Sequence, residues 1–294
     1  MRVFVTGSNG FIASALVKNL IDAGHGVLGL TRSDAGAKAL IAAGAEVHRG
    51  SLEDLESLRS GAAAADAVIH TAFNHDFSRF QQNCEEDRRA IEAMGDVLVG
   101  SSKPLIVTSG LALLAQGRAA TEDDPPAPLS PSYPRASEHA AAALEKRGVR
   151  AMVVRLPQVH DTRKQGLVSF AIQVAREKGV SAYIGNGKNR WAAAHLHDAA
   201  RVYNLALEKG HAGARYHAVA EEGVCAKDIA EAIGRGLNVP VKSISQEEAA
   251  AHFGWIGGFF GLDLVASSAK TRNELGWNPT GPTLLDDLEK MQYS

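Results

Sequence analysis

The first 156 residues alternate between short continuous apolar runs and stretches whose apolar residues recur every three or four positions. Continuous runs predict buried parallel strands, and the wider spacing predicts amphipathic helices between them. This alternation predicts an α/β, Rossmann-type, doubly wound parallel sheet. The predicted strands cover residues 2–6, 27–30, 45–48, 66–70, 103–108 and 150–156, and the predicted helices cover 11–23, 35–43, 84–100 and 134–147, with one more that begins near residue 51.

The pattern after Leu156 is more mixed. One strand is predicted at 214–219, and residues 253–261 are expected to form an aromatic, glycine-rich loop. Helical spacing covers 166–178, 198–209, 226–237 and 247–253. We expect a separate C-terminal region at 157–294 that crosses back to the sheet once.

A glycine-rich turn joins the first predicted strand to the first helix. One glycine would permit the tight turn, the next would let the backbone approach a pyrophosphate, and the helix N-terminus would offer free N–H groups. The sequence therefore predicts that residues 1–156 bind a dinucleotide; a glycine turn that binds nothing is the alternative. The predicted contacts are Gly7, Ser8, Asn9, Gly10, Phe11 and Ile12, followed by Ala13 where a third glycine is common.

The residues after the second strand bear on which nicotinamide cofactor binds. An acidic residue there would hydrogen-bond the ribose hydroxyls of NAD, but the sequence has Thr31-Arg32-Ser33. A cation beside a neutral residue suits a 2′-phosphate, so we expect NADP (NADPH) rather than NAD. Asp34 leaves some room for NAD, and an ordinary solvated arginine is the alternative for Arg32.

Further cofactor contacts are expected at the carboxyl ends of later strands, where open parallel sheets bind ligands. Small side chains there would let phosphates and ribose lie across the strand ends. Phe73 is a candidate for substrate contact as well. The candidates are Ser51 and Leu52 after the third strand, Thr71, Ala72 and Phe73 after the fourth, and Thr108 in the fifth.

Composition and charge narrow the class of protein. The 294 residues are 45% hydrophobic and 22% charged, with a formal charge of −2 and two cysteines. This is the profile of a soluble globular protein, without a basic excess for nucleic acid or a cysteine framework. No signal peptide or membrane span is visible. We expect a cytoplasmic monomer or homodimer that acts on a small molecule, with neither nucleic acid nor membrane as partner.

Several short motifs, taken in order, resemble the extended branch of the short-chain dehydrogenase/reductase superfamily, which is related to nucleotide-sugar epimerases. The resemblance covers nearly the whole chain and implies a nicotinamide-binding N-terminal domain and a smaller C-terminal region, residues 157–294, that mainly binds substrate. It also implies that Pro157 and Val159 present their backbone to the nicotinamide, although the exit of a core strand would explain both. The motifs are TGSNGFI at 6–12, VIHTA at 68–72, VTS at 107–109, VRLPQV at 154–159, HLHDAA at 195–200 and ELGWNP at 274–279.

The resemblance implies a catalytic serine, a tyrosine, and a lysine four residues after the tyrosine. Ser109 matches the serine and Tyr133 the tyrosine, but Ser137 occupies the lysine position. Arg135 is expected to point to a different face of the helix. A phenol without a nearby cation stays protonated at neutral pH, so Tyr133 could give a proton to a carbonyl more easily than remove one from an alcohol.

These features together predict an NADP(H)-dependent oxidoreductase that reduces a carbonyl, or a similar unsaturated group, by hydride transfer. One alternative is a nucleotide-sugar epimerase or dehydratase, and another is a non-catalytic NADP-binding sensor or scaffold. Tyr133 could instead be a structural aromatic at the helix entry, and an alignment anchored on Glu138 would leave no catalytic tyrosine. Ser109 could instead cap nearby N–H groups.

Substrate contacts are less constrained. His160 occupies the place of a tyrosine usual in the family and could face substrate, but it could equally be packed or solvated. Trp191, with the loop at 253–261, could line an apolar substrate pocket or form a dimer contact.

Two histidines raise the question of a metal. His195 and His197 alternate like strand residues and precede Asp198, a natural helix cap. Two such histidines without a third ligand make a poor metal site, so no metal is expected.

Overall fold

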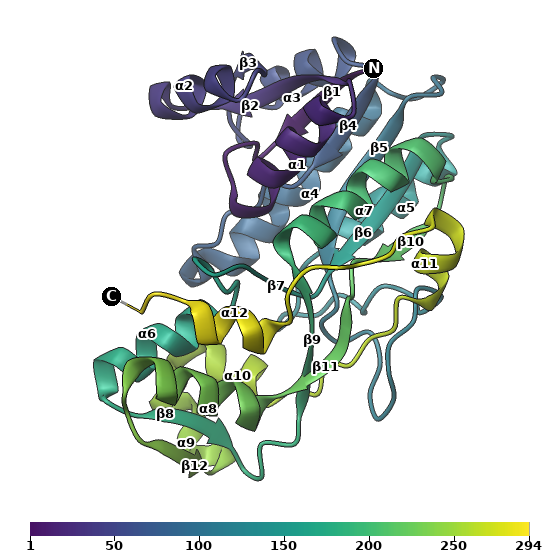
Figure 1. Cartoon of the computed structure of the whole chain (residues 1–294). Coiled ribbons are helices and arrows are strands. Elements are labelled where there is room, and N and C mark those ends of the chain that lie inside the picture. Colours follow the sequence, from purple (N-terminus) through teal and green to yellow (C-terminus); the bar gives the residue numbers. More distant parts are fainter. Residues whose placement is uncertain (294) are drawn as a thin grey trace.

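The computed structural model describes residues 1–293 and centres on one seven-stranded sheet (Figure 1). All neighbouring strands in this sheet run parallel, in the order β10-β6-β5-β4-β1-β2-β3. The strands are β1 (Arg2–Thr6), β2 (Gly26–Thr31), β3 (Glu46–Arg49), β4 (Ala67–His70), β5 (Pro104–Gly110), β6 (Arg150–Leu156) and β10 (Arg215–His217). The predicted doubly wound α/β fold is confirmed.

Helices cover both faces of this sheet because successive strand residues point to opposite sides. Val3 and Val5 face the layer of α1 and α7, whereas Phe4 faces the layer of α3, α4 and α5. The inner strands are therefore buried on both faces, which is why their sequences are continuous apolar runs, whereas the edge strand β3 reads EVHR and has no buried residue. The helices that flank the sheet are α1 (Phe11–Asp22), α2 (Asp34–Ala42), α3 (Leu55–Ala63), α4 (Phe80–Asp96), α5 (Ser137–Lys146) and α7 (Leu196–Lys209).

The second region lies beyond the carboxyl ends of the strands and has its own hydrophobic core (Figure 1). One small sheet joins β7 (Gln158–His160), β9 (Arg190–His195) and β11 (Glu221–Cys225), and another joins β8 (Ser181–Ile184) and β12 (Val241–Ile244). The helices of this region are α6 (Val168–Lys178), α8 (Ala226–Leu237), α9 (Gln246–Phe253), η2 (Gly254–Ile256), α10 (Gly257–Phe260) and α12 (Leu284–Lys290).

The chain returns to the large sheet after it has entered the second region. α7 packs on the sheet in the same layer as α1, and β10 then adds the seventh strand beside β6. A later return brings α11 (Ala269–Leu275) and Trp277 into the same layer, where the indole Nε1 donates to the Asp198 carbonyl at 3.0 Å.

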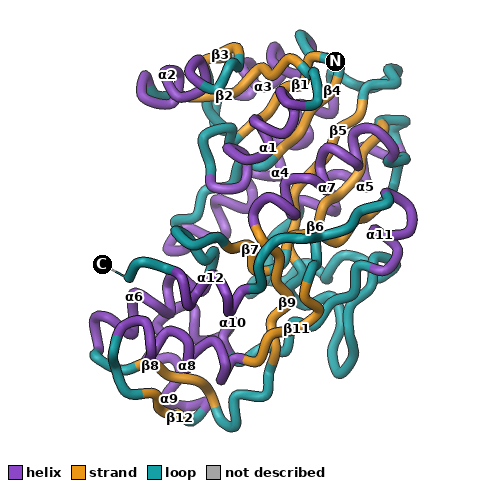
Figure 2. The backbone as a smooth tube through the Cα atoms, in the orientation of Figure 1, coloured by secondary structure: helices purple, strands orange, loops and turns teal. Residues whose placement is uncertain are grey.

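Element boundaries differ from the sequence prediction at several places. The helix predicted at 84–100 is α4, at Phe80–Asp96, preceded by η1 (Phe77–Arg79), and residues 253–261 contain two short helices rather than a loop. The helix predicted from 134 begins only at Ser137, because Ser130 and Tyr133 exchange backbone hydrogen bonds in a tight turn just before it. The long connection from β5 to α5, residues 111–136, is drawn as loop in Figure 2.

Candidate functional site

The glycine turn after β1 is shaped by a close contact with the end of β4. Gly7 has φ +67°, and a Cβ on it would lie 2.7 Å from the Ala72 Cα, so no larger residue fits. The Gly10 N–H donates to the Gly7 carbonyl at 2.7 Å. Gly10 is also the N-cap of α1, so the helix has no side-chain cap, and its first turn has no acidic residue. The first N–H groups of α1 are therefore available to an anion, and the turn fits a dinucleotide's phosphates.

The two polar side chains of the turn hold it in place. Ser8 is buried and its hydroxyl donates to the Leu30 carbonyl at 2.8 Å, which ties the turn to β2. The Asn9 side chain donates to the Gly36 carbonyl at 3.1 Å, at the start of α2. Any contact of Ser8 with a cofactor would therefore come from its backbone.

The tip of β2 presents one unpaired cation. Thr31 is buried, and the Ser33 hydroxyl accepts from the Gly36 N–H at 3.0 Å as the N-cap of α2. Arg32 is exposed, and within residues 1–293 its guanidinium has neither a hydrogen bond nor an ion pair. Asp34, the acid that left room for NAD, is exposed and pairs with Arg49 at 2.5 Å.

A cavity of about 320 Å³ adjoins the predicted contacts after β3. Ser51 does not cap α3 directly: its hydroxyl accepts from the Asp54 N–H at 3.3 Å, and Asp54 caps the helix through the Ser57 N–H at 3.1 Å. No sequence pattern marks the wall that α4 and η1 contribute to this cavity. The lining residues are Leu52, Glu53, Leu55, Arg79, Gln82, Glu86 and Arg89.

Two threonines tie together the ends of β1, β4 and β5. The Thr71 hydroxyl donates to the Thr6 carbonyl at 2.7 Å, and the Thr108 hydroxyl donates to the His70 carbonyl at 2.7 Å. Thr108 Oγ1 also lies 2.8 Å from the Tyr203 hydroxyl of α7. These hydroxyls fix the edge on which a cofactor would lie.

A buried hydrogen-bonded chain, which sequence reasoning missed, runs beneath this edge. The Ser137 hydroxyl donates to Asp87 Oδ2 at 2.6 Å, and Asp87 Oδ1 lies 3.0 Å from His70 Nε2. His70 Nδ1 lies 2.8 Å from the Thr6 hydroxyl, which accepts from the Ala72 N–H at 3.4 Å. Because a carboxylate only accepts, Nε2 of His70 carries the proton. These hydrogen bonds connect Ser137 of α5 to Ala72, the residue that packs on Gly7.

Arg135 lies elsewhere than helical spacing predicted. Tyr133 and Arg135 belong to the loop before α5, so the expectation that Arg135 points to another face of the helix is wrong. Its Nε donates to the Ser137 hydroxyl at 3.2 Å and its Nη2 to the Thr108 carbonyl at 3.5 Å. The guanidinium carbon lies 4.4 Å from the centre of the Phe73 ring. A cation is therefore present at the end of β5.

The two predicted catalytic residues are both buried. Ser109 lies near the end of β5, and within residues 1–293 its hydroxyl caps no N–H group. Burial raises the pKa of the Tyr133 phenol, and the charge of Arg135 opposes that rise. Tyr133 is therefore protonated at neutral pH.

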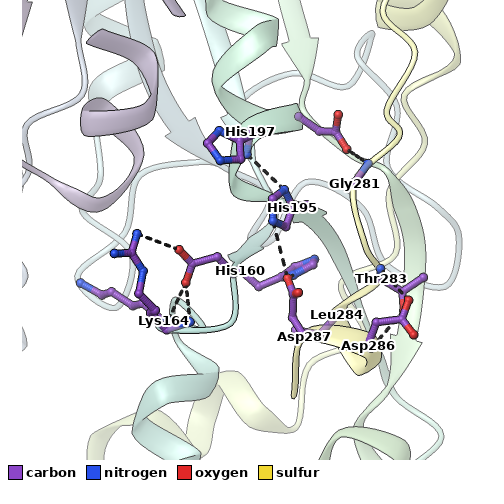
Figure 3. Close-up of polar contacts among 12 residues, drawn as sticks. His160, Lys164, His195, His197, Gly281, Thr283, Leu284, Asp286 and Asp287 are labelled. Atoms are coloured by element: carbon purple, nitrogen blue, oxygen red, sulfur yellow. Dashed lines mark hydrogen bonds and ion pairs between the residues drawn. The ribbon is translucent and has the colours of Figure 1, made fainter. Parts of the chain in front are cut away.

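His160 is packed rather than solvated (Figure 3). Its Nδ1 lies 2.7 Å from Asp287 Oδ2 of α12, and its Nε2 lies 3.8 Å from Glu221 Oε2 and has no hydrogen bond. Burial lowers the pKa of His160 although Asp287 opposes that effect. His195 Nε2 lies 3.9 Å from the same Asp287 oxygen. A substrate role for His160 stays a prediction.

Asp198 does not cap α7. The helix begins at Leu196 with His195 as its N-cap, and His195 Nδ1 accepts from the His197 N–H at 3.4 Å. The Asp198 carboxylate instead accepts from the Gly281 N–H at 2.7 Å, which anchors the segment before α12. Among residues 1–293, no group of three or more His, Cys, Asp or Glu side chains could hold a metal ion.

The remaining candidates lie in packed surroundings. Trp191 is buried in the core of the second region, where it stacks on Phe260 at 5.1 Å and donates to the Leu262 carbonyl at 3.2 Å. Val159 is buried against the large sheet's core, and Pro157 is half-buried just before it. Their roles in binding stay predictions.

Comparison with known proteins gives consistent matches. Residues 3–220 match the model of the NAD-dependent epimerase/dehydratase family. An uncharacterized protein of Schizosaccharomyces pombe is 49% identical over 296 residues, which cover 100% of both chains. A 2-alkyl-3-oxoalkanoate reductase of Stenotrophomonas maltophilia is 27% identical over 85% of this chain and 76% of its own.

Solved structures share the fold. The crystal structure of a dTDP-glucose 4,6-dehydratase from Streptomyces venezuelae, with NAD bound, superposes with a TM-score of 0.77 at 20% identity. The match covers 99% of this chain and 96% of that one. Among residues 1–293, no helix is both long and apolar enough to cross a bilayer.

Proposed function

The chain belongs to the NAD-dependent epimerase/dehydratase family, and we propose that it is an NADP(H)-dependent reductase that transfers hydride to a carbonyl or similar unsaturated group of a small molecule. One observation carries the choice of reduction over oxidation: the Tyr133 phenol is buried, and burial raises its pKa. A phenol that keeps its proton at neutral pH is suited to give it to a carbonyl oxygen.

Each proposed role matches what the group can supply: hydride, a hydrogen bond, a proton or a site for phosphate. NADPH, when bound, supplies the hydride that reduces the carbonyl carbon. Ser109 donates a hydrogen bond to the carbonyl oxygen, and Tyr133 transfers its proton to that oxygen as charge develops on it. The glycine turn and the N-terminus of α1 hold the cofactor's phosphates, since Gly7 leaves room for close approach.

The proposed preference for NADP rests on Arg32. Its guanidinium is exposed and unpaired within residues 1–293, at the tip of β2. A 2′-phosphate there would gain a charged partner, whereas the ribose hydroxyls of NAD would share the Asp34 carboxylate with Arg49.

The 27% identical 2-alkyl-3-oxoalkanoate reductase supports reduction of a ketone as the reaction class. The test is a panel of apolar, aromatic and sugar-derived carbonyl compounds, assayed by loss of NADPH absorbance. We expect turnover with at least one ketone or aldehyde, faster with NADPH than with NADH.

Two results would count against this function. Tight NADPH binding without turnover of any carbonyl would favour a non-catalytic sensor or scaffold. Conversion of a nucleotide sugar with no net cofactor consumption would favour the epimerase alternative. Fluorescence titration with both cofactors, run in parallel, separates failure of binding from failure of chemistry.

A further inference from the structure

We propose that Lys164, which belongs to the second region, binds the pyrophosphate of the nicotinamide cofactor at the N-terminus of α1. This role requires only the dinucleotide binding for which the family is named. It is therefore independent of the proposed reaction and of the preference for NADP. Lys164 holds phosphate oxygens in this arrangement and takes no part in hydride or proton transfer.

The ammonium of Lys164 lies over the first residue of α1. Its Nζ is 5.5 Å from the centre of the Phe11 ring, a distance at which a cation is attracted to the ring face. Phe11 follows Gly10, the N-cap, and the Cα–Cβ bonds of a helix tilt toward its N-terminus. The ring and the ammonium above it therefore lie beside the first turn of α1, whose N–H groups have no side-chain cap.

The positive charge of Lys164 is not paired. Within residues 1–293, no carboxylate oxygen lies within 4.0 Å of its ammonium. Asp161, the acid in the same turn, pairs with Arg163 at 3.6 Å, so two cations share one carboxylate and the turn keeps a net positive charge. The first turn of α1 has no acidic residue either.

Two positive groups thus lie together at one end of α1: the ammonium of Lys164 and the N-terminal end of the helix dipole. Their mutual repulsion becomes attraction once an anion lies between them. The glycine turn leaves room at this end of the helix for a dinucleotide's phosphates, because Gly7 has no side chain. A pyrophosphate is therefore the anion that this arrangement fits.

The turn that carries Lys164 is held by its own hydrogen bonds. Asp161 is buried, and its Oδ1 accepts from the N–H groups of Arg163 and Lys164 at 2.7 Å each. The Asp161 N–H donates to the Lys164 carbonyl at 2.9 Å. The backbone of Lys164 is fixed in this way, while its side chain extends away from His160 and His195 (Figure 3).

A phosphate bound by both groups would join the two regions of the molecule. The glycine turn and α1 belong to the large sheet's layers, whereas Lys164 lies in the connection from β7 to α6. NADPH and NADH both carry the pyrophosphate, but only NADPH carries the 2′-phosphate proposed to bind Arg32. The two cations therefore predict different dependences on the ligand.

Calorimetric titration of Lys164→Gln tests the proposal without any substrate. We expect the dissociation constants of NADPH and NADH to rise by the same factor, about tenfold, because a charged hydrogen bond to the shared pyrophosphate is lost. Binding of adenosine 2′-monophosphate, which has a 2′-phosphate but no pyrophosphate, should be unchanged. Lys164→Arg keeps the charge and should keep most of the affinity for both cofactors.

Arg163→Gln is the matched control, since it removes the same charge from the adjacent position of the same turn, where the guanidinium is exposed and faces Asp161. Its effect on either cofactor should be small, because an exposed charge that does not touch the ligand is screened by salt. Equal losses in Arg163→Gln and Lys164→Gln would reduce the effect to long-range charge and overturn the proposal. Unchanged affinity for both cofactors in a folded Lys164→Gln would overturn it as well.

The binding measurements separate this role from the proposed function. Absence of turnover with every carbonyl would contradict the proposed reaction and leave the role of Lys164 intact. A rise in KM for an anionic substrate, with both cofactor dissociation constants unchanged in Lys164→Gln, would make Lys164 a substrate contact and reject its proposed role. Failure of the unmodified protein to bind either cofactor would reject both.

Discussion

The Ser137 hydroxyl donates a 2.6 Å hydrogen bond to Asp87, and both side chains are buried. This hydrogen bond holds Ser137, the residue four positions after Tyr133, in the interior of the protein. It also begins the chain that passes through His70 and Thr6 to the Ala72 N–H. The candidate catalytic loop and the glycine turn are therefore held by one set of hydrogen bonds.

Breaking this chain should destabilise the fold. Asp87→Asn keeps the shape of the side chain but cannot accept from both Ser137 and His70, so a buried donor loses its partner. We expect the free energy of unfolding to fall by about 2 kcal/mol, measured by urea denaturation. Asp96→Asn is the control, because Asp96 lies on the same helix, half-exposed, in a surface pair with Arg147. Equal losses in both variants would contradict a special role for the chain.

Substitution of the first glycine should weaken cofactor binding. In Gly7→Ala the new Cβ would lie 2.7 Å from the Ala72 Cα, so the turn must move. We expect NADPH affinity, measured by fluorescence titration, to fall at least about tenfold. Gly24→Ala provides the comparison, since Gly24 also has a positive φ, +82°, but nothing lies within 4 Å of its added Cβ. A similar loss of binding in both variants would show that backbone strain, rather than crowding at Ala72, is responsible.

Removal of the cation at the tip of β2 should change the choice of cofactor. Arg32→Gln is expected to weaken NADPH binding about tenfold and to leave NADH binding nearly unchanged, because only NADPH carries the 2′-phosphate. The ratio of the two dissociation constants is the measurement. Lys103→Gln, just before the amino end of the inner strand β5, should leave that ratio unaltered. If NADH already binds more tightly to the unmodified protein, the role proposed for Arg32 is wrong.

Loss of the Tyr133 hydroxyl should impair chemistry more than binding. Tyr133→Phe is expected to reduce kcat by about 10²-fold or more, with KM and the NADPH dissociation constant nearly unchanged. Tyr183→Phe is the control, since Tyr183 belongs to β8 in the second region. Turnover that survives in Tyr133→Phe would remove the phenol from the mechanism and favour the alternative of a packed aromatic at the entry to α5.

His217 should make the fold sensitive to acid. Burial, reinforced by Arg155, lowers the pKa of His217 to about 4, and its Nδ1 lies 2.8 Å from the Ser267 carbonyl. Between the ordinary pKa near 6.5 and that value, the unfolded chain binds a proton that the folded chain does not. The free energy of unfolding should therefore fall as the pH falls, by on the order of 3 kcal/mol in total.

The dependence of the free energy of unfolding on pH shows whether His217 is responsible for this loss. His217→Gln can still donate to the Ser267 carbonyl and accept from Arg155, but it cannot titrate, so stability should depend less on pH between about 6.5 and 4. His211→Gln removes an exposed histidine and should leave the slope unchanged. Identical slopes in the unmodified protein and in His217→Gln would exclude His217 as the source.

Most of the large sheet was predictable because its inner strands are buried on both faces and so are continuous apolar runs. The strands missed in the second region are short, and several carry mixed patterns; β11, for example, spans Glu221–Cys225 and has little apolar content. Burial there comes from tertiary packing rather than from local sequence. Periodicity over a few residues cannot reveal such strands.

The part of the candidate site that could be predicted is the glycine turn, because its backbone conformation requires particular residues. A glycine turn between strand and helix requires its glycines, so the motif marks the place. Arg135 was misplaced because helical spacing was applied to a loop that only reaches α5 at Ser137. The contact of His160 with Asp287 joins residues 127 positions apart, and no local pattern marks such a pair.

The position of β10 at the edge of the large sheet affects how the molecule can be divided. β10 and α7 both follow the chain's first excursion into the second region, yet both belong to the sheet layer. A fragment ending at Leu156 would expose the apolar face of the sheet beneath α7 and leave β6 as an open, aggregation-prone edge. The two regions are thus interleaved along the chain, and the nucleotide-binding half cannot be cut out as a module without removing part of its own core.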